Sequence, residues 1–188
     1  MELVQPDATH LASYVAALER GWSPDNERGR ATADEQLARI GADAAGFLAS
    51  LDNPNGLGSL TLPDGCEVAR LPSRVRWLWD GEFVGSIGLR WQPGTPALPP
   101  YCLGHIGYAV VPWKQRRGHA SRALARVLAD ARTWLPGLGL PFVEITTDPD
   151  NLASQKVIAA NGGLLHERFT KPASFGSRPA LRFRIALD

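Results

Sequence analysis

The residues from Val110 to Ser121, VVPWKQRRGHAS, bring positive charge, a glycine and small side chains to the expected junction of a strand and a helix. The first turn of a helix offers backbone N–H groups without intrahelical partners and a partial positive charge, so it can hold an anion. Gly118 would let that anion approach the backbone, and Arg116 and Arg117 would add positive charge. The stretch therefore suits a pyrophosphate, and a solvated basic turn is the alternative.

Other common nucleotide-binding motifs are missing from the sequence. It contains no GxGxxG and no GxxxxGK[ST], which disfavours a dinucleotide-binding turn and a P-loop NTPase. The formal net charge is +1, from 20 basic and 19 acidic residues, whereas a dedicated DNA-binding domain normally has a strong basic excess. We therefore expect a small phosphorylated ligand for this stretch and no nucleic-acid partner.

Composition indicates a globular protein with no membrane partner. The hydrophobic fraction is 44% and the charged fraction 21%, which are ordinary values for soluble domains. No apolar run approaches the ~20 residues that a membrane-spanning helix needs, and the segment MELVQPDATH does not resemble a signal peptide. Cys66 and Cys102 have no CxxC partner and no metal-ligand spacing is visible, so we expect free thiols, no metal and a cytoplasmic location.

The elements that would position the basic stretch follow from periodicity and turn residues. Two helices are expected near the N-terminus, one over 9–20 with Thr9 as its N-cap and one from Asp34 past Leu48. Asp80 and Gly81 separate two apolar stretches, which predicts a β-hairpin. The other expected elements are strands at 2–4, 104–111 and 142–147, helices at 118–134 and 151–161, and a closing hairpin at 164–169 and 180–187.

The order of these elements predicts an α+β fold in a single domain over residues 1–188. The strand, helix and strand over 105–147 form a βαβ unit, whose two strands should be parallel neighbours. The other strands are expected to be mostly antiparallel, within one mixed central sheet of about seven strands flanked by helices. The segments 51–74 and 92–103 are expected to be irregular connections, the second stiffened by four prolines into a wall or lid.

Two motifs resemble those of the GNAT family of N-acetyltransferases. The first is QRRGHA, from Gln115 to Ala120, which matches the signature Q/R-x-x-G-x-G/A and follows a strand ending in Val-Val-Pro. The second is NLASQKVI, from Asn151 to Ile158, which is closed by the turn at 161–163. Together the two motifs are specific, and the resemblance is strongest over residues 75–170. It implies the GNAT fold and acetyl-CoA, or another acyl-CoA, as co-substrate.

The resemblance also implies which residues would bind the donor. Backbone N–H groups from Arg116 to Ser121 would hold the pyrophosphate, and Asn151 would contact pantetheine or act only as a helix N-cap. The edge at Val110 and Val111 would hydrogen bond the pantetheine amides, and an N–H there could stabilise the oxyanion. The full implied set is Val110, Val111, Gln115, Arg116, Arg117, Gly118, His119, Ala120, Ser121, Asn151 and Ser154.

The groups that would move protons depart from the family's pattern. His105 stands where the family often has a glutamate; it could act as a base, because histidine titrates near neutral pH, or bond a backbone carbonyl as a structural residue. Ile158 stands where the family often has a tyrosine acid, and it cannot donate a proton. Glu144, between apolar residues of a strand, is a second candidate base, or else part of a solvated face.

The resulting interpretation is an N-acetyltransferase that passes the acetyl group directly to a primary amine within a ternary complex. A protein N-terminus or a lysine is an alternative acceptor, and a non-catalytic acyl-CoA sensor is a rival from another class. The sequence does not identify the acceptor, which would be a small-molecule or peptide amine, and it is compatible with a homodimer. Tyr108 is expected to pack, and Arg168, Arg182 and Arg184 are expected to form a solvated face of the last hairpin.

Overall fold

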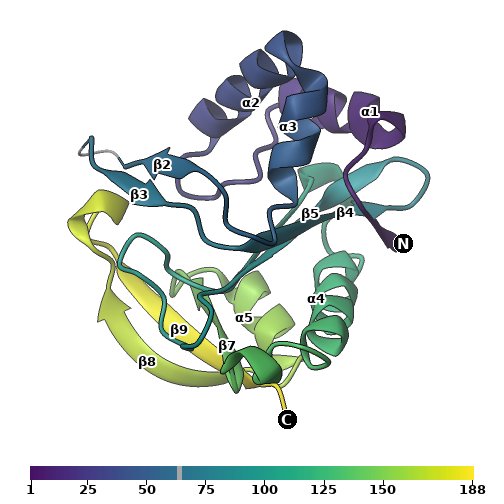
Figure 1. Cartoon of the computed structure of the whole chain (residues 1–188). Helices are drawn as coiled ribbons and strands as arrows, with labels where there is room; N and C mark the ends of the chain where they lie inside the picture. Colours follow the sequence, from purple (N-terminus) through teal and green to yellow (C-terminus); the bar gives the residue numbers. More distant parts are fainter. Residues whose placement is uncertain (63–64) are drawn as a thin grey trace.

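Most strands of the protein lie in two antiparallel sheets that face different helices (Figure 1). The structure is a computed structural model that describes residues 1–62 and 65–188. The first sheet has the order β1-β4-β5-β6, with the bounds Glu2–Val4, Ser73–Trp79, Phe83–Arg90 and Ile106–Val110. The second has the order β7-β9-β8, with the bounds Phe142–Thr147, Pro179–Ala186 and Leu164–Thr170.

The two sheets meet where β6 and β7 begin. The His105 N–H donates to the Glu144 carbonyl at 2.8 Å, and the Thr146 hydroxyl donates to the Leu103 carbonyl at 2.6 Å. Gly104 fits into this junction because a Cβ there would lie 3.1 Å from the Glu144 carbonyl oxygen, closer than most side chains tolerate. The strands of the expected βαβ unit are thus neighbours at their beginnings, but they belong to different sheets and not to one continuous ladder.

Three helices cover one face of the first sheet: α1 (Ala8–Glu19), α2 (Arg30–Ala42) and α3 (Ala44–Leu51). They enclose an aromatic core in which Tyr14 stacks on Trp77 with ring centroids 4.5 Å apart. The expected single helix after Asp34 is interrupted at Asp43, whose side chain accepts from the Gly46 N–H and so caps a third helix. Asp7, rather than the expected Thr9, caps α1 in the same way.

The second core lies beneath both sheets, against α4 (His119–Ala131) and α5 (Leu152–Ala159). Ala123, Leu124 and Leu128 are buried at helical spacing on α4, as the periodicity of the sequence predicts. From β7 and β9, Ile145 and Phe183 contribute to the same core. Because side chains alternate along a strand, the residues between them face the opposite side of the second sheet.

Two remaining features complete the fold. The connection over 51–74 contains a short hairpin, β2 (Ser59–Thr61) with β3 (Glu67–Ala69), where only irregular chain is expected; its residues Pro63 and Asp64 lie outside the described residues. The short 3-10 helices are η1 (Pro112–Lys114), η2 (Pro136–Leu138) and η3 (Ala173–Phe175). None of the helices in the described part of the chain has the length and hydrophobicity to span a membrane.

Candidate functional site

The loop between β6 and α4 ends in a backbone conformation that suits an anion. Gly118 is the N-cap of α4 with φ 72°, and no side chain caps the helix there, so its first N–H groups remain available. Arg116 also has a positive φ, 61°. A Cβ at Gly118 would lie 2.9 Å from Nη1 of Arg122, so a side chain would meet both backbone strain and a neighbour.

A buried lysine fixes this loop to the hairpin between β4 and β5. Lys114 is 6% exposed, and its Nζ lies 2.5 Å from Asp80 Oδ1 and 2.8 Å from Glu82 Oε1. Burial by itself lowers the pKa of Lys114, but the hydrogen bonds to Asp80 and Glu82 outweigh it and raise that pKa above the ordinary value. The lysine therefore stays charged, and it holds the loop against the turn between β4 and β5.

The other loop residues of the predicted donor set surround the helix start. The side chains of Arg116 and Arg117 are exposed, and the Arg117 carbonyl accepts from Arg122 Nη2 at 2.9 Å. His119 is 8% exposed, and burial followed by the charge of Arg122 lowers its pKa. Ala120 is half-buried in the first turn of α4. The two arginines can thus add charge beside the helix start without being part of its packing.

The register of β6 decides which backbone groups face away from β5. The Arg90 N–H donates to the His105 carbonyl at 2.8 Å, and the Val111 N–H donates to the Val84 carbonyl at 2.9 Å. Alternate residues of an antiparallel strand turn both backbone groups toward the partner. The N–H groups of Tyr108 and Val110 therefore point to the open edge of β6, which is the last strand of its sheet.

This register corrects the expectation for Val111. Its N–H bonds to β5 and cannot also bond a ligand, whereas the Val110 N–H remains directed outward. The Val110 carbonyl accepts from Nε2 of Gln115 at 3.2 Å, so that side chain supports the end of the strand. The open edge thus offers the donors of residues 108 and 110, and it leads directly into the loop before α4.

Polar contacts cap helix α5, join it to this edge and tie its far end to α4. Oδ1 of Asn151 accepts from the Ser154 N–H at 3.0 Å, which makes Asn151 the N-cap of the helix. The Ser154 hydroxyl and the Tyr108 hydroxyl share a hydrogen bond of 2.8 Å, which joins α5 to β6. At the other end, Nδ2 of Asn161 lies 3.3 Å from the Ser121 carbonyl and hydroxyl. The structure thus brings both predicted motifs together.

His105 is buried at the junction of the sheets. Its Nδ1 accepts from the Glu144 N–H at 2.9 Å, so the proton of the neutral ring is on Nε2, which is buried without a hydrogen-bond partner among the described atoms. Burial, together with the charges of Arg90 and Arg184, lowers the pKa of His105 to about 4. A histidine with this pKa and an occupied acceptor nitrogen is a poor base at neutral pH, so the geometry favours a structural role. In that role His105 bonds a backbone N–H and not the backbone carbonyl that is expected from the sequence.

We expect His105 to make the stability of the protein sensitive to acid. Because its folded pKa of about 4 lies below the ordinary 6.5, the unfolded chain binds more protons between these values. The contribution of the neutral His105 to the free energy of unfolding is therefore complete above pH 6.5 and is lost as the pH falls toward 4. Between pH 7 and pH 5 this loss amounts to about 2 kcal/mol. In His105→Asn an amide oxygen can still accept the Glu144 N–H, but nothing titrates.

Urea unfolding at pH 7 and pH 5 measures this effect. The loss of unfolding free energy on acidification should be smaller in His105→Asn than in the wild type by about 2 kcal/mol. Groups shared by the two proteins cancel in the comparison. An equal loss in both proteins would show that His105 is not held neutral by its surroundings.

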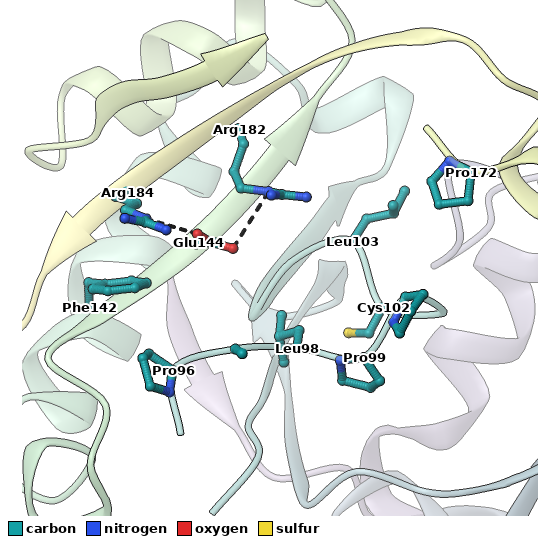
Figure 2. A pocket seen from close by; sticks show the side chains of 12 residues that line it. Pro96, Leu98, Pro99, Cys102, Leu103, Phe142, Glu144, Pro172, Arg182 and Arg184 are labelled. Atoms are coloured by element: carbon teal, nitrogen blue, oxygen red, sulfur yellow. Dashed lines mark hydrogen bonds and ion pairs between the residues drawn. The ribbon is translucent and has the colours of Figure 1, made fainter. Parts of the chain in front are cut away.

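Glu144, the second candidate base, is held by two arginines. Its Oε1 accepts from Nε of Arg184 at 2.9 Å, and its Oε2 lies 3.5 Å from Nε of Arg182. The carboxylate is 7% exposed, and both oxygens face positive charge (Figure 2). Because both carboxylate oxygens are occupied by arginines, the arrangement disfavours Glu144 as a base. Arg182 and Arg184 are only partly exposed and line a cavity, whereas the pattern of the sequence predicts a solvated face.

A buried ion-pair cluster joins three segments next to the C-terminal end of β7. Lys171 is 3% exposed and pairs with Glu27, from the loop after α1, and with Asp148, at 2.7 Å. Arg178 also pairs with Glu27, at 2.5 Å. Sequence reasoning misses this cluster because its members are far apart in the chain and share no motif.

Comparison with known proteins agrees with this architecture. The profile of the Acetyltransferase (GNAT) domain family matches residues 3–163. No curated protein sequence matches the chain. Among solved structures, RimL, a ribosomal L7/L12 alpha-N-protein acetyltransferase in complex with coenzyme A, superimposes with a TM-score of 0.62 at 12% identity, over 98% of this chain and 92% of that chain.

Two further solved structures are similar over nearly the whole chain. The microcin C7 self-immunity acetyltransferase MccE, in complex with acetyl-CoA and AMP, has a TM-score of 0.61 at 12% identity and covers 98% of this chain and 91% of its own. A variant of the spermidine N-acetyltransferase SpeG from Vibrio cholerae has a TM-score of 0.57 at 13% identity and covers 100% and 95%. At these identities the likeness shows a shared fold.

Proposed function

This chain belongs to the acetyltransferase (GNAT) domain family, and on that premise we propose that it transfers an acetyl group from acetyl-CoA to a primary amine. The observation that carries the proposal is the open edge of β6, which turns two N–H groups outward and continues into the uncapped start of α4. An edge of amide donors followed by an anion site matches a ligand with an amide-containing arm and a pyrophosphate. A cytoplasmic location stays a prediction.

The residues present fit such a donor substrate. The N–H groups at the start of α4 would hold the pyrophosphate, with Gly118 leaving room for it. The outward backbone groups of Tyr108 would pair with an amide of the pantetheine arm, in the way that one strand pairs with another, and the outward N–H of Val110 would remain for the thioester carbonyl. Asn151 and Ser154 cap and fix the helix beside this arm, whatever further contact their side chains make with it.

The chemistry then needs orientation and one well-placed donor. The amine nitrogen attacks the thioester carbon, the C–S bond breaks, and the proton lost by the amine is balanced by the one that the departing thiolate takes up. An outward N–H at residue 110 would stabilise the negative charge on the carbonyl oxygen as it develops. Burial, although opposed by the hydrogen bond from Ser154, raises the pKa of Tyr108 to about 12, so its hydroxyl keeps its proton at neutral pH.

A direct transfer without a covalent enzyme intermediate is part of the proposal. Cys102 is 9% exposed, and its thiol donates to the Gly104 carbonyl at 3.5 Å, on the far side of the sheet junction from the start of α4. A primary amine is the acceptor class named in the solved relatives, as spermidine for SpeG and as a ribosomal protein for RimL. Their low identity makes the amine a proposal for this chain.

An acceptor screen tests the function. The protein is incubated with acetyl-CoA and a panel of polyamines, amino-acid amides and short peptides, and thiol release is followed together with the mass of the products. We expect enzyme-dependent thiol release with at least one amine and a product heavier by one acetyl group. Calorimetric binding of acetyl-CoA without thiol release for any amine would instead support an acyl-CoA sensor.

A further inference from the structure

A cavity lies on the face of the second sheet that is turned away from α4 and α5. It has a volume of about 340 Å³, is open to solvent on one side, and lies between the proline-rich loop over 92–103 and the strands β7 and β9 (Figure 2). The strands contribute Phe142 and a polar wall of Arg182, Arg184 and Glu144, and the loop contributes an apolar wall that includes Leu98 and Pro99. None of these residues has a part in the donor site described above.

The polar wall has more hydrogen-bond donors than the protein itself uses. A guanidinium carries five N–H groups. Among the described residues, Arg184 donates one of them to Glu144, and Arg182 donates one to Glu167 at 3.2 Å. Nε of Arg182 is buried and faces Glu144 Oε2 at 3.5 Å, so the spare donors are on the terminal nitrogens of the two arginines. The two arginines can therefore still bind an oxygen-rich, negatively charged group, while Glu144 holds them in place.

The opposite wall makes such binding stronger than on an open surface. The leucine and proline side chains of the loop exclude water from this side of the cavity. Arg184 lies over the ring of Phe142, with its guanidinium carbon 4.2 Å from the ring centroid, which limits its freedom. A charge-assisted hydrogen bond made beside such walls is screened less than one in water.

The cavity runs beside β7, from its first residue toward the segment that follows β8. Phe142 lies at one end and Pro172 at the other (Figure 2). Lys171, next to Pro172, pairs with Asp148, which directly follows β7. Arg184 is opposite Glu144 in the β7–β9 register. Glu144 precedes Thr147, the last residue of β7, by three positions, which corresponds to about 10 Å along a strand.

We infer that this cavity selects the acceptor: it binds an acidic group, such as a carboxylate, while the amine to be acetylated lies beside the C-terminal end of β7, about 10 Å away. The inference rests on the proposed acetyl transfer, and it narrows the acceptor to acid-bearing amines, of which a short peptide with a free C-terminus is the simplest. An extended tripeptide spans about 10 Å and therefore fits this spacing.

Matched acceptors test the inference on the wild-type protein. Triglycine and triglycinamide share the same amine and differ in the charge of the far end. We expect kcat/KM with acetyl-CoA to be about 10- to 100-fold higher for triglycine, the effect of losing a hydrogen bond to a charged group. Glycine and glycinamide are too short to reach both sites, and neither should be preferred by more than a small factor.

Variants then locate the effect. Arg184→Gln should reduce the preference for triglycine to near unity, while Arg168→Gln, which removes an arginine of the same hairpin that does not line the cavity, should keep it. Thermal unfolding shows whether each variant is folded, and the wild-type comparison does not depend on either. Equal kcat/KM for triglycine and triglycinamide would overturn the assignment while leaving the acetyltransferase intact.

A binding measurement separates failure of this inference from failure of the proposed function. If no amine gives thiol release, the proposed function fails, and the cavity is judged by calorimetric titration with triglycine. Binding to the wild type that Arg184→Gln weakens at least about 10-fold would support an acid-binding cavity. Equal binding of triglycine and triglycinamide, or no binding of either, would overturn it.

Discussion

Replacing Gly118 with tryptophan should abolish measurable binding of acetyl-CoA, with a dissociation constant raised at least about 100-fold, or about 2.7 kcal/mol. The N-cap of α4 has φ 72°, where a side chain costs about 1–2 kcal/mol in backbone energy. An indole there would also occupy the space in front of the helix N–H groups. Calorimetric titration with acetyl-CoA measures the effect.

A control must separate this loss from general backbone strain. Gly29, the N-cap of α2, has φ 52° and open space where its Cβ would be, so Gly29→Trp introduces comparable strain at the start of a different helix. Its affinity for acetyl-CoA should equal that of the wild type. Unchanged affinity in Gly118→Trp would mean that the start of α4 does not hold the pyrophosphate, and the proposed donor site would have to be abandoned.

Replacing Val110 with proline should lower kcat by about 100- to 1000-fold, the usual effect of removing one oxyanion donor. The N–H of Val110 points to the open edge of β6, so its removal takes no hydrogen bond from the pairing with β5. Proline is tolerated on edge strands when its missing N–H faces outward. The variant should therefore fold, and steady-state thiol release measures the loss.

The neighbouring position gives the opposite expectation. Val111 has φ −57°, which proline can adopt, but its N–H donates to the Val84 carbonyl. Val111→Pro should lower the unfolding free energy by about 1–3 kcal/mol, because that carbonyl loses its donor. The folded fraction should keep most of its kcat. The reverse pattern, with Val111→Pro inactive and Val110→Pro active, would show that the assignment of the oxyanion donor to Val110 is wrong.

Local features of the donor site could be predicted from the sequence. Gly118 at a helix start, the periodic apolar face of α4 and the Asn151 cap each depend on a few neighbouring residues, and the structure shows the expected helix starts at both positions. The family resemblance supplied the ligand class, which local physics alone left open between a phosphate site and a solvated turn.

Features that depend on pairing between distant segments could not be predicted. Periodicity places Val110 and Val111 on a strand, but the partner strand decides which N–H is free. The sequence left His105 open between a base and a structural residue, because the N–H of Glu144 to which it bonds belongs to a residue 39 positions away. Arg182 and Arg184 occupy alternate positions of a strand, which is also the pattern of a solvated face. Their place in a cavity results from the packing of the distant loop over 92–103, which the pattern does not reveal.

The register of β6 has a consequence for how proteins with this architecture can diverge. One residue inserted or deleted within the strand would exchange the inward and outward amides and turn every side chain to the other face. The proline-rich loop ahead of it has no such constraint, since a change in loop length costs little closure entropy. Insertions and deletions should therefore accumulate in the loop and be purged from the strand, so that acceptor choice drifts while use of the donor persists.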